Sequence, residues 1–420
     1  MPKHIIALVI AVLLPAVALA GGYAVPNVSP RDLSMCGSLH AAQDDAGAAF
    51  VNPAALSRLD GISVSLAGAF IDIKSTWTGI APEAQGTATM LTKLAFPPAV
   101  FAGYGGRFSD GELGWGVGLG MTVPFGGNVF WPDTWPGRFD IETVNRRIYG
   151  TYLTAGIQPL KWLRVGGGLI WYRGTEELSQ KVNFLTTETT AKLATSGNKL
   201  SFDLSLELQP IEPLRIGVDY KHKADMSLTG DATFGGAPPQ FAAQTLDQGV
   251  THDLSMPNYF ALGASWQFSP ALLVTGAFTW DRFRVYDKDA FIGDKGAAII
   301  VQRNYHNGYT FRLGAEAVAM PRLKVRAGIL RDIAPTPPEW LSPTIPDADV
   351  WAGSIGLGYT VMKGLDVNVA YFHAFFDTTT TPKTGPGGTY NVFPGTYETR
   401  ANIGSIGVSW APTWGSSRAD

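Results

Sequence analysis

Strict two-residue alternation of apolar and polar side chains is the dominant pattern in this sequence of 420 residues. Between residues 200 and 204, for example, Leu200, Phe202 and Leu204 alternate with Ser201 and Asp203. A period of two places the two sets on opposite faces of a β-strand, one apolar and one polar. The apolar faces run to about five residues, which suits tilted membrane-spanning strands of roughly ten residues better than a secreted β-sandwich.

The alternating segments are separated by connections of two kinds. We predict strands near 61–74, 96–108, 112–125, 145–158, 162–174, 198–209, 213–225, 254–268, 271–286, 306–319, 322–332, 350–361, 365–377 and 399–410. Tight turns between them alternate with long loops near 75–95, 126–144, 175–197, 226–253, 287–305, 333–349 and 378–398. An even number of strands with short turns on one side and long loops on the other is typical of bacterial outer-membrane barrels. The predicted fold class is therefore all-β, a transmembrane antiparallel β-barrel of about 14 strands.

The first twenty residues have the pattern of a secretion signal. Lys3 precedes an apolar run over residues 5–20, which ends in the small-x-small sequence Ala18-Leu19-Ala20. We predict a signal peptide over 1–20, cleaved after Ala20. The chain has only 16% charged residues, and no other segment approaches the roughly 18 apolar residues of a spanning helix. The net charge of −3 gives no reason to expect a nucleic-acid partner, and the single cysteine, Cys36, leaves no internal disulfide framework.

Residues 21–60 do not follow the strand pattern. This segment is rich in small residues and contains Asn52-Pro53-Ala54, in which proline fixes φ and removes a backbone donor. Such a segment suits a compact plug inside a barrel. The predicted organisation is a signal peptide over 1–20, an N-terminal hatch over 21–60, a barrel over 61–410 and a C-terminal tail over 411–420.

The chain resembles the FadL/TodX (OmpP1) family of outer-membrane transporters of long-chain fatty acids and other hydrophobic molecules. The motifs that carry the resemblance are Asp44-Asp45-Ala46, Asn52-Pro53-Ala54, Trp135-Pro136-Gly137-Arg138, Arg326-Ala327-Gly328 and Gly356-Leu357-Gly358-Tyr359. The resemblance implies that a hatch plugs the barrel and that ligand lands between extracellular loops. It also implies an internal pocket, a lateral exit at a kink in the third strand, and passive transport.

The third predicted strand carries glycine at alternate positions, namely Gly114, Gly116, Gly118 and Gly120. Glycine within a strand marks a bulge or a close backbone approach, so this strand is expected to be deformable. The resemblance implies that Asn52, Pro53 and Ala54 form the hatch turn beside the gap. The alternative reading of the same glycines is tight packing of the strand against the plug.

Two sets of residues are candidates for binding ligand. Aromatic side chains in two long loops would form an apolar landing surface, or would pack on one another and seal the barrel: Phe130, Trp131, Trp135, Phe139, Phe234 and Phe241. A fatty acid needs a cation for its carboxylate, best supplied by arginine. Arg312 and Lys221 are the candidates, although salt bridges inside the lumen are the expected fate of most such cations.

Together with the barrel pattern, the resemblance implies an outer-membrane transporter for the passive uptake of hydrophobic small molecules, with fatty acids as the default from the family. Uptake of neutral aromatic or aliphatic hydrocarbons is the close alternative, and a general porin is a more distant one. An enzyme such as an outer-membrane lipase is not expected, because the sequence has no Gly-x-Ser-x-Gly elbow and no metal-spaced histidine pair. We expect no cofactor and no metal, a monomer, and outer-membrane lipid around the barrel.

Overall fold

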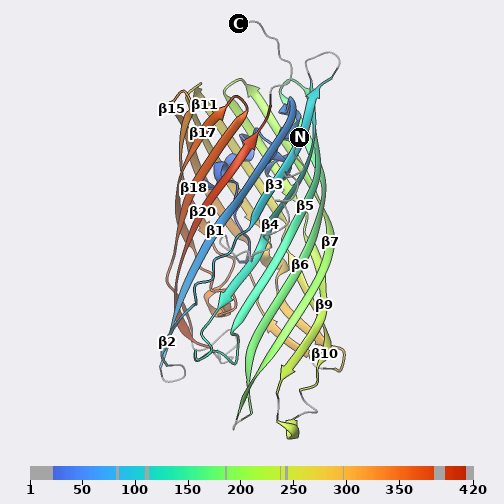
Figure 1. The fold of residues 1–420 in the computed structure, drawn as a ribbon, viewed down its shortest axis with the longest axis vertical. Coiled ribbons are helices and arrows are strands. Elements are labelled where there is room, and N and C mark those ends of the chain that lie inside the picture. The colour runs from blue at the N-terminus through green and yellow to red at the C-terminus, as the bar shows by residue number, and fades with distance from the viewer. Residues whose placement is uncertain are drawn as a thin grey trace, which may run out of the picture.

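The computed structural model describes residues 22–81, 85–108, 113–184, 187–236, 238–241, 245–296, 298–382 and 393–412. The predicted signal peptide and most of the predicted tail lie outside these residues. Within them, one antiparallel sheet closes into a tall barrel, and the N-terminal helices lie inside it (Figure 1). The helices are α1 (Pro30–Leu33), η2 (Leu39–Ala41), α2 (Ala48–Val51), η3 (Pro53–Arg58), η4 (Pro239–Phe241), η5 (Phe283–Val285) and η6 (Pro338–Trp340). None of the described helices has both the length and the apolar character needed to cross a bilayer.

The strands account for most of the described chain. They are β1 (Gly61–Gly79), β2 (Thr87–Thr89), β3 (Pro98–Arg107), β4 (Gly114–Phe130), β5 (Thr143–Leu160), β6 (Leu163–Asn183), β7 (Glu188–Ile211), β8 (Leu214–Lys221), β9 (Ala224–Gly235), β10 (Gln248–Met256), β11 (Tyr259–Ser269), β12 (Leu272–Asp281), β13 (Lys288–Gly293), β14 (Ala298–Gln302), β15 (Gly308–Met320), β16 (Leu323–Ile333), β17 (Val350–Met362), β18 (Leu365–Phe376), β19 (Thr379–Thr381) and β20 (Gly395–Trp410).

The barrel wall has fourteen staves, as predicted, where a stave is one position in the wall, formed by a single strand or by two successive strands in line. β7 pairs with both β8 and β9, so these two strands are successive parts of one stave. The same holds for β10 with β11, for β12 with β13 and for β14 with β15. β1 pairs with β3 on one side and with β20 on the other, which closes the sheet into a barrel.

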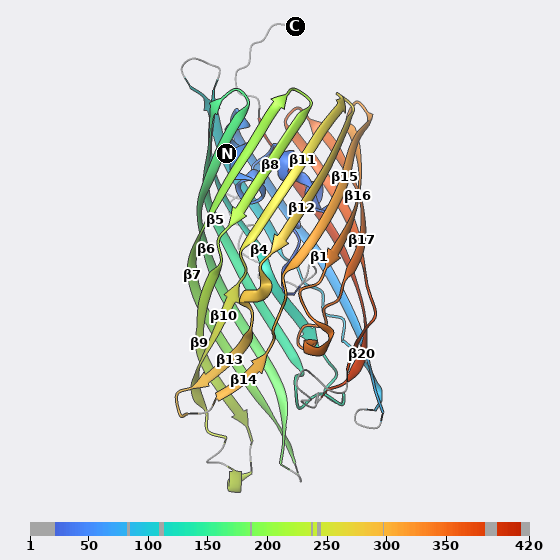
Figure 2. The ribbon, with the colours of Figure 1, turned by 180° about the vertical axis from the view of Figure 1, so that it is seen from behind.

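Three of the predicted long loops are largely strand. β6 and β7 pair continuously from Leu163–Leu208 to Asn183–Glu188, so residues 175–197 form a hairpin, and β9, β10, β13 and β14 occupy much of 226–253 and 287–305. Figure 2 shows these extensions at the end of the barrel opposite the short turns. In β9 and in the β6–β7 hairpin beyond Trp171 the outward residues are mostly polar, so the apolar alternation that marks a lipid-facing strand is absent there.

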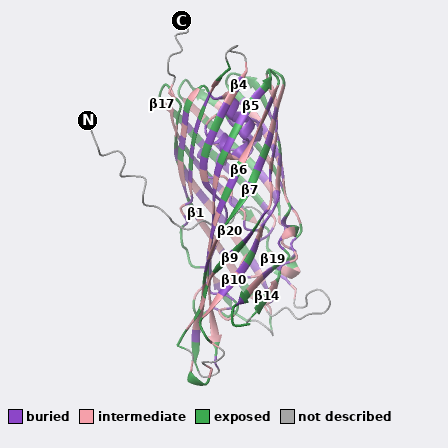
Figure 3. Cartoon of the chain, turned by 90° about the vertical axis from the view of Figure 1, so that its right-hand side faces the viewer, coloured by how far each residue is buried: buried purple, intermediate pink, exposed green. Residues whose placement is uncertain are grey.

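The outward face changes character along each long strand. On β6, Leu169 and Trp171 are about half exposed and apolar, whereas the next outward residues are Arg173, Thr175 and Glu177. Figure 3 shows the alternation of buried and exposed positions along the strands. Because an apolar band marks the lipid-facing zone, the strands beyond Trp171 stand in water on the side of the long hairpins, which is extracellular in this architecture.

The segment from Gly22 to Asp60 lies within the lumen, towards the end with the short turns (Figure 1). Its apolar side chains, including Leu33, Leu39 and Leu56, are almost fully buried. Cys36 is buried, and its backbone N–H donates to Ser354 Oγ at 3.2 Å. The aliphatic and aromatic inward residues of the barrel thus pack on this segment instead of enclosing an open channel.

Candidate functional site

Three of the four β4 glycines face the N-terminal segment. A Cβ on Gly114 would clash with the carbonyl of Ser57, one on Gly116 with the carbonyl of Leu56, and one on Gly118 would lie 2.8 Å from Ala49 Cβ. Gly120 instead faces the ring of Phe101 on β3. The glycines therefore allow the segment to approach the strand closely, which is the packing alternative for this motif.

The turn Asn52-Pro53-Ala54 contacts β5, β6 and β7. Asn52 Nδ2 donates to His40 O at 2.8 Å, and Ala54 N–H donates to Ser205 Oγ of β7 at 2.8 Å. The backbone of Pro53 and Ala54 lies against Gly156 of β5 and Gly166 of β6. Asn52 caps η3, and the following residues Leu56 and Ser57 approach β4. The place of the turn itself beside the gap stays a prediction.

β4 is irregular beyond the glycines. Its ladder with β3 ends at the Val100–Met121 pair, and in the described chain the next backbone bond across is Leu91 N–H to Phe130 O at 2.7 Å. The register with β5 shifts between Thr122 and Phe125, around Pro124, which has no N–H to donate. From Thr122 to Phe130 almost every residue is buried, so alternation between lumen and lipid is lost there. The wall between β3 and β4 is therefore interrupted over this stretch.

Residues 22–25 cover the interruption from inside. Val25 N–H donates to Pro124 O at 2.9 Å, and Gly126 N–H donates to Tyr23 O at 2.9 Å. The Tyr23 hydroxyl donates to Ser255 O at 2.5 Å, and its ring packs edge-on against Phe283 and Tyr286. This stretch, which gave no signal in the sequence, forms a short antiparallel bridge with β4 at Ala24–Phe125.

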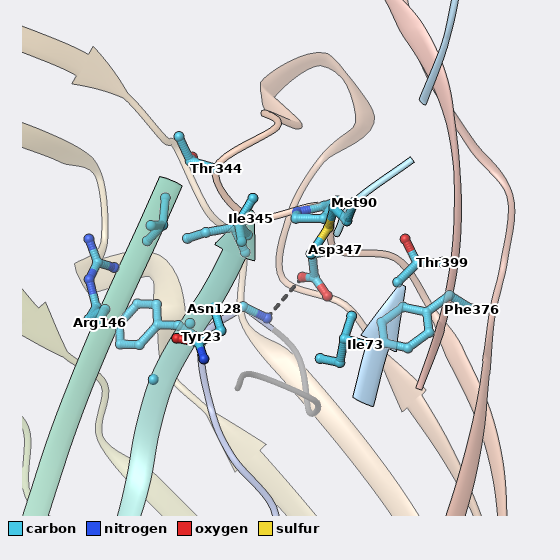
Figure 4. Close-up of a pocket in the computed structure, with 16 residues that line it drawn as sticks. Tyr23, Ile73, Met90, Asn128, Arg146, Thr344, Ile345, Asp347, Phe376 and Thr399 are labelled. Atoms are coloured by element: carbon cyan, nitrogen blue, oxygen red, sulfur yellow. Dashed lines mark hydrogen bonds between the residues drawn. The ribbon is translucent and has the colours of Figure 1, made fainter. Parts of the chain in front are cut away.

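Two cavities lie on either side of this bridge. The outer cavity, of about 40 Å³, is bordered by Tyr23, Asn128, Arg146 and the loop residues 344–347 (Figure 4). The carboxylate of Asp347 there accepts the Gly22 N–H at 2.9 Å, drawn as the dashed line in Figure 4. Burial raises the pKa of this loop carboxyl to about 7, although the Gly22 N–H bond lowers it.

The inner cavity, of about 110 Å³, lies next to the N-terminal helices. Its lining includes apolar rings such as Phe50, Phe125 and Phe372 and both predicted cations, Lys221 and Arg312. Part of this lining lies where a stave is divided into two strands. Lys221 is the last residue of β8, Tyr259 is the first of β11 and Asp281 is the last of β12. The register of these breaks brings polar side chains from distant parts of the sequence to one level of the lumen.

The two cations differ in how they are paired. Lys221 Nζ lies 3.4 Å from Asp203 Oδ2 and forms a closer ion pair with Asp219, so its charge is already balanced. Arg312 Nη1 donates to Thr279 Oγ1 at 2.7 Å, and no ion pair within 4.0 Å is found for it among the described residues. Arg312 therefore keeps N–H groups and an unbalanced charge for a further acceptor, whereas the charge of Lys221 is already balanced by two carboxylates.

The predicted landing aromatics are mostly packed on one another. Trp131 and Trp135 are 2% exposed and stack with ring centroids 4.5 Å apart, and Phe130 is also buried. Phe139, Phe234 and Phe241 are partly buried, and Phe241 lies 4.9 Å from the ring of Phe184. Phe130, Trp131 and Trp135 are buried because Trp77 and the neighbouring loops cover them, as in the alternative of mutual packing. Whether ligand lands on this region stays a prediction.

A buried charge cluster holds the extracellular strand extensions together. His252 of β10 is fully buried, and its Nδ1–H and Nε2–H donate to Glu176 at 2.6 Å and to Asp289 at 3.0 Å. Arg146 pairs with Glu176, and Arg303 pairs with Asp289 at 2.8 Å. Burial lowers the pKa of His252, but the two carboxylates outweigh it and raise that pKa to about 9. The imidazolium thus links β6, β10 and β13 in the water-exposed part of the barrel.

The sequence matches a known family over nearly its whole length. The model of the family of outer membrane protein transport proteins (OMPP1/FadL/TodX) matches residues 11–411. This chain belongs to that family. Its members are outer-membrane transporters of hydrophobic compounds, and the protein is an outer-membrane β-barrel.

Individual relatives are distant in sequence but similar along their whole length. An outer membrane protein of Neisseria meningitidis serogroup B is 22% identical, over 86% of this chain and 87% of that protein. The long-chain fatty acid transport protein of Escherichia coli O6:H1 is 21% identical, over 79% of this chain and 81% of that protein. Among solved structures, a Pseudomonas aeruginosa FadL homologue has a TM-score of 0.82 at 19% identity, covering 93% of this chain and 99% of that one. The Pseudomonas putida toluene transporter TodX has a TM-score of 0.69 at 14% identity, covering 94% and 100%.

Proposed function

We propose that this protein takes up long-chain fatty acids and similar amphiphiles by passive diffusion. Ligand passes from the extracellular loops into the outer and then the inner cavity, and leaves sideways between β3 and β4. The observation that carries the proposal is the end of the β3–β4 ladder at Val100–Met121, beside both cavities. A hydrophobic molecule released there enters the bilayer without crossing the water beyond it.

The hatch is part of this proposal. Residues 21–60 would block the direct path to the periplasm, and residues 22–25 would be the movable part that covers the lateral opening. Support comes from the small number of backbone bonds that hold residues 22–25 to β4, against the many contacts of η3 with β4, β5 and β6. A gate needs a local element of low stability on a stable support.

Arg312 is the proposed partner for the ligand head group. It lines the inner cavity and retains N–H donors. A guanidinium group can donate two parallel N–H bonds to the two oxygens of a carboxyl group. Lys221 is a weaker candidate than expected because Asp203 and Asp219 hold it. The family relationship and the Escherichia coli relative support a fatty acid, whereas the similarity of fold to TodX supports neutral hydrocarbons as the second candidate.

A reversible crosslink tests the lateral exit. The Cα atoms of an antiparallel bridge pair lie about 4.5–5.5 Å apart, within the range that a disulfide spans. Ala24→Cys with Phe125→Cys, in a Cys36→Ser background, would therefore tie residues 22–25 to β4. In cells that lack their own transporter, we expect oxidation to abolish uptake of labelled oleate and reduction to restore it.

A second isolated bridge provides a matched control. Ile71→Cys with Ala95→Cys ties β1 to the segment before β3 and leaves residues 22–25 free to move from β4. Uptake should persist in this oxidised variant. If the oxidised Ala24–Phe125 pair transports oleate as fast as its reduced form, the lateral route is wrong. Uptake of toluene but not oleate by the wild type would select the hydrocarbon alternative.

A further inference from the structure

The outer cavity contains an amide without a partner. Asn128 of β4 is 4% exposed, and neither its Oδ1 nor its Nδ2 has a hydrogen-bond partner among the described residues. Its side chain lines the outer cavity beside Tyr23 and Asp347 (Figure 4). A buried amide left unpaired is costly, so this position favours a ligand that both donates and accepts a hydrogen bond.

The inner cavity contains more carboxyl groups than free cations. Its ionisable and hydrogen-bonding side chains come from many of the surrounding elements: Asn27, Asp32 of α1, Cys36, His40 of η2, Tyr152 of β5, Tyr172 of β6, Lys221 of β8, Tyr259 of β11, Asp281 of β12, Thr310 of β15 and Asp332 of β16. Since Lys221 is paired with aspartates behind the cavity wall, Arg312 is the cation that remains for three carboxyl groups.

The carboxyl groups are held in place. Asp32 accepts from Asn27 Nδ2 at 2.9 Å and from Leu39 N–H at 3.3 Å, while Asp332 Oδ1 accepts from Thr310 Oγ1 at 2.6 Å. Asp281 lies at the end of β12, two residues from Thr279, which binds Arg312. An ionised ligand carboxylate at Arg312 would therefore enter a site in which carboxyl groups already outnumber the one available cation, and two ionised carboxylates in a desolvated site repel each other.

We propose that both cavities bind the ligand head group in an uncharged form that donates a hydrogen bond. Alcohols, phenols and protonated carboxylic acids belong to this class. The head-group oxygen accepts from Arg312, and its O–H donates to a cavity carboxylate such as Asp281; Asn128 makes the equivalent pair of bonds in the outer cavity. This inference rests on the proposed function, which it narrows: a fatty acid would be carried as the neutral acid.

Chain-matched ligands test the proposal. The protein in nanodiscs is loaded with radiolabelled 1-dodecanol, which is then displaced by unlabelled dodecanol, dodecanoate or dodecane at about pH 8, where a carboxylic acid of pKa about 4.3 is ionised. Dodecanol should bind at least about tenfold more tightly than dodecanoate. Asp281→Asn or Asp332→Asn should raise the binding affinity for dodecanoate by about tenfold. The same variants should change the affinity for dodecanol by less than about twofold.

The variants separate the outcomes. Asn128→Leu should weaken the binding of dodecanol but not that of dodecane. Asp231→Asn, at an exposed position, is the control and should change the binding of none of the ligands. If dodecanoate binds more tightly than dodecanol and the aspartate variants keep that order, the neutral-head-group inference is wrong while the proposed function stands. If neither alcohol, acid nor hydrocarbon binds to the protein, the proposed function fails as well.

Discussion

Gly118 offers the sharpest test of how the N-terminal segment is seated against β4. An alanine there would place Cβ 2.8 Å from Ala49 Cβ and 3.0 Å from Leu56 Cδ1, while ordinary van der Waals contact begins near 3.4 Å. The neighbours would have to retreat by about 0.6 Å, and the Ala49 methyl has no rotamer with which to do so. Overpacking of this kind costs typically 1–3 kcal/mol, against a gain of about 0.4–1 kcal/mol from replacing glycine, so Gly118→Ala should lose about 1–2 kcal/mol.

Gly404→Ala is the matched control. Gly404 lies within β20, and nothing lies within 4 Å of an added Cβ. Only the gain of about 0.4–1 kcal/mol should remain there, so the two substitutions should differ in sign. Unfolding in detergent can be followed by denaturant titration, with ion conductance in planar bilayers as a second readout for a displaced segment. Equal unfolding free energies for the two variants would refute the packing described for Gly118.

Three further predictions concern the extracellular half. His252→Gln should cost about 3 kcal/mol of unfolding free energy at about pH 6, and this cost should vanish as pH rises through about 9, because the imidazolium that bonds Glu176 is then lost; a cost independent of pH would contradict this. Asp347→Asn should stabilise the protein increasingly over wild type as pH rises from about 4 to about 7, since the native carboxyl keeps its proton over that range and the unfolded one does not; thermal unfolding at several pH values measures this. Trp135→Ala should lower the free energy of unfolding by about 3–5 kcal/mol, because it empties the stack on Trp131, and an unchanged melting temperature would exclude that packing.

The barrel could be predicted from the sequence because the bilayer requires apolar side chains at the outward-facing positions of each strand. Leu200 and Trp171, for example, face the bilayer and are apolar, whereas their neighbours in the sequence face the lumen and can be polar. This alternation marked all fourteen spanning segments. The rule ends where the strands enter water. The hairpin of β6 and β7 beyond Arg173 is held by the same backbone bonds, but neither of its faces needs a fixed polarity.

The interior could be predicted only in part. Arg312 and Lys221 were found as cations on lumen faces, but their different pairing depends on the register of β7 with β8 and on Thr279 of another strand. The bridge of Ala24 with Phe125 consists of backbone bonds between segments a hundred residues apart, and such bonds carry no local side-chain pattern. The β4 glycines signalled a close approach without revealing that η3 supplies it.

The seam between β1 and β20 bears on how such a molecule is assembled. These strands are joined over the whole length from Val64–Trp410 to Gly79–Gly395, so the last stave made closes against the first. Residues 22–60 lie immediately before β1 and are enclosed by that closure. We therefore expect them to enter the lumen before β1 and β20 pair. A bulky group fused ahead of residues 22–60 should therefore slow the pairing of β1 with β20, whereas one fused after β20 should not.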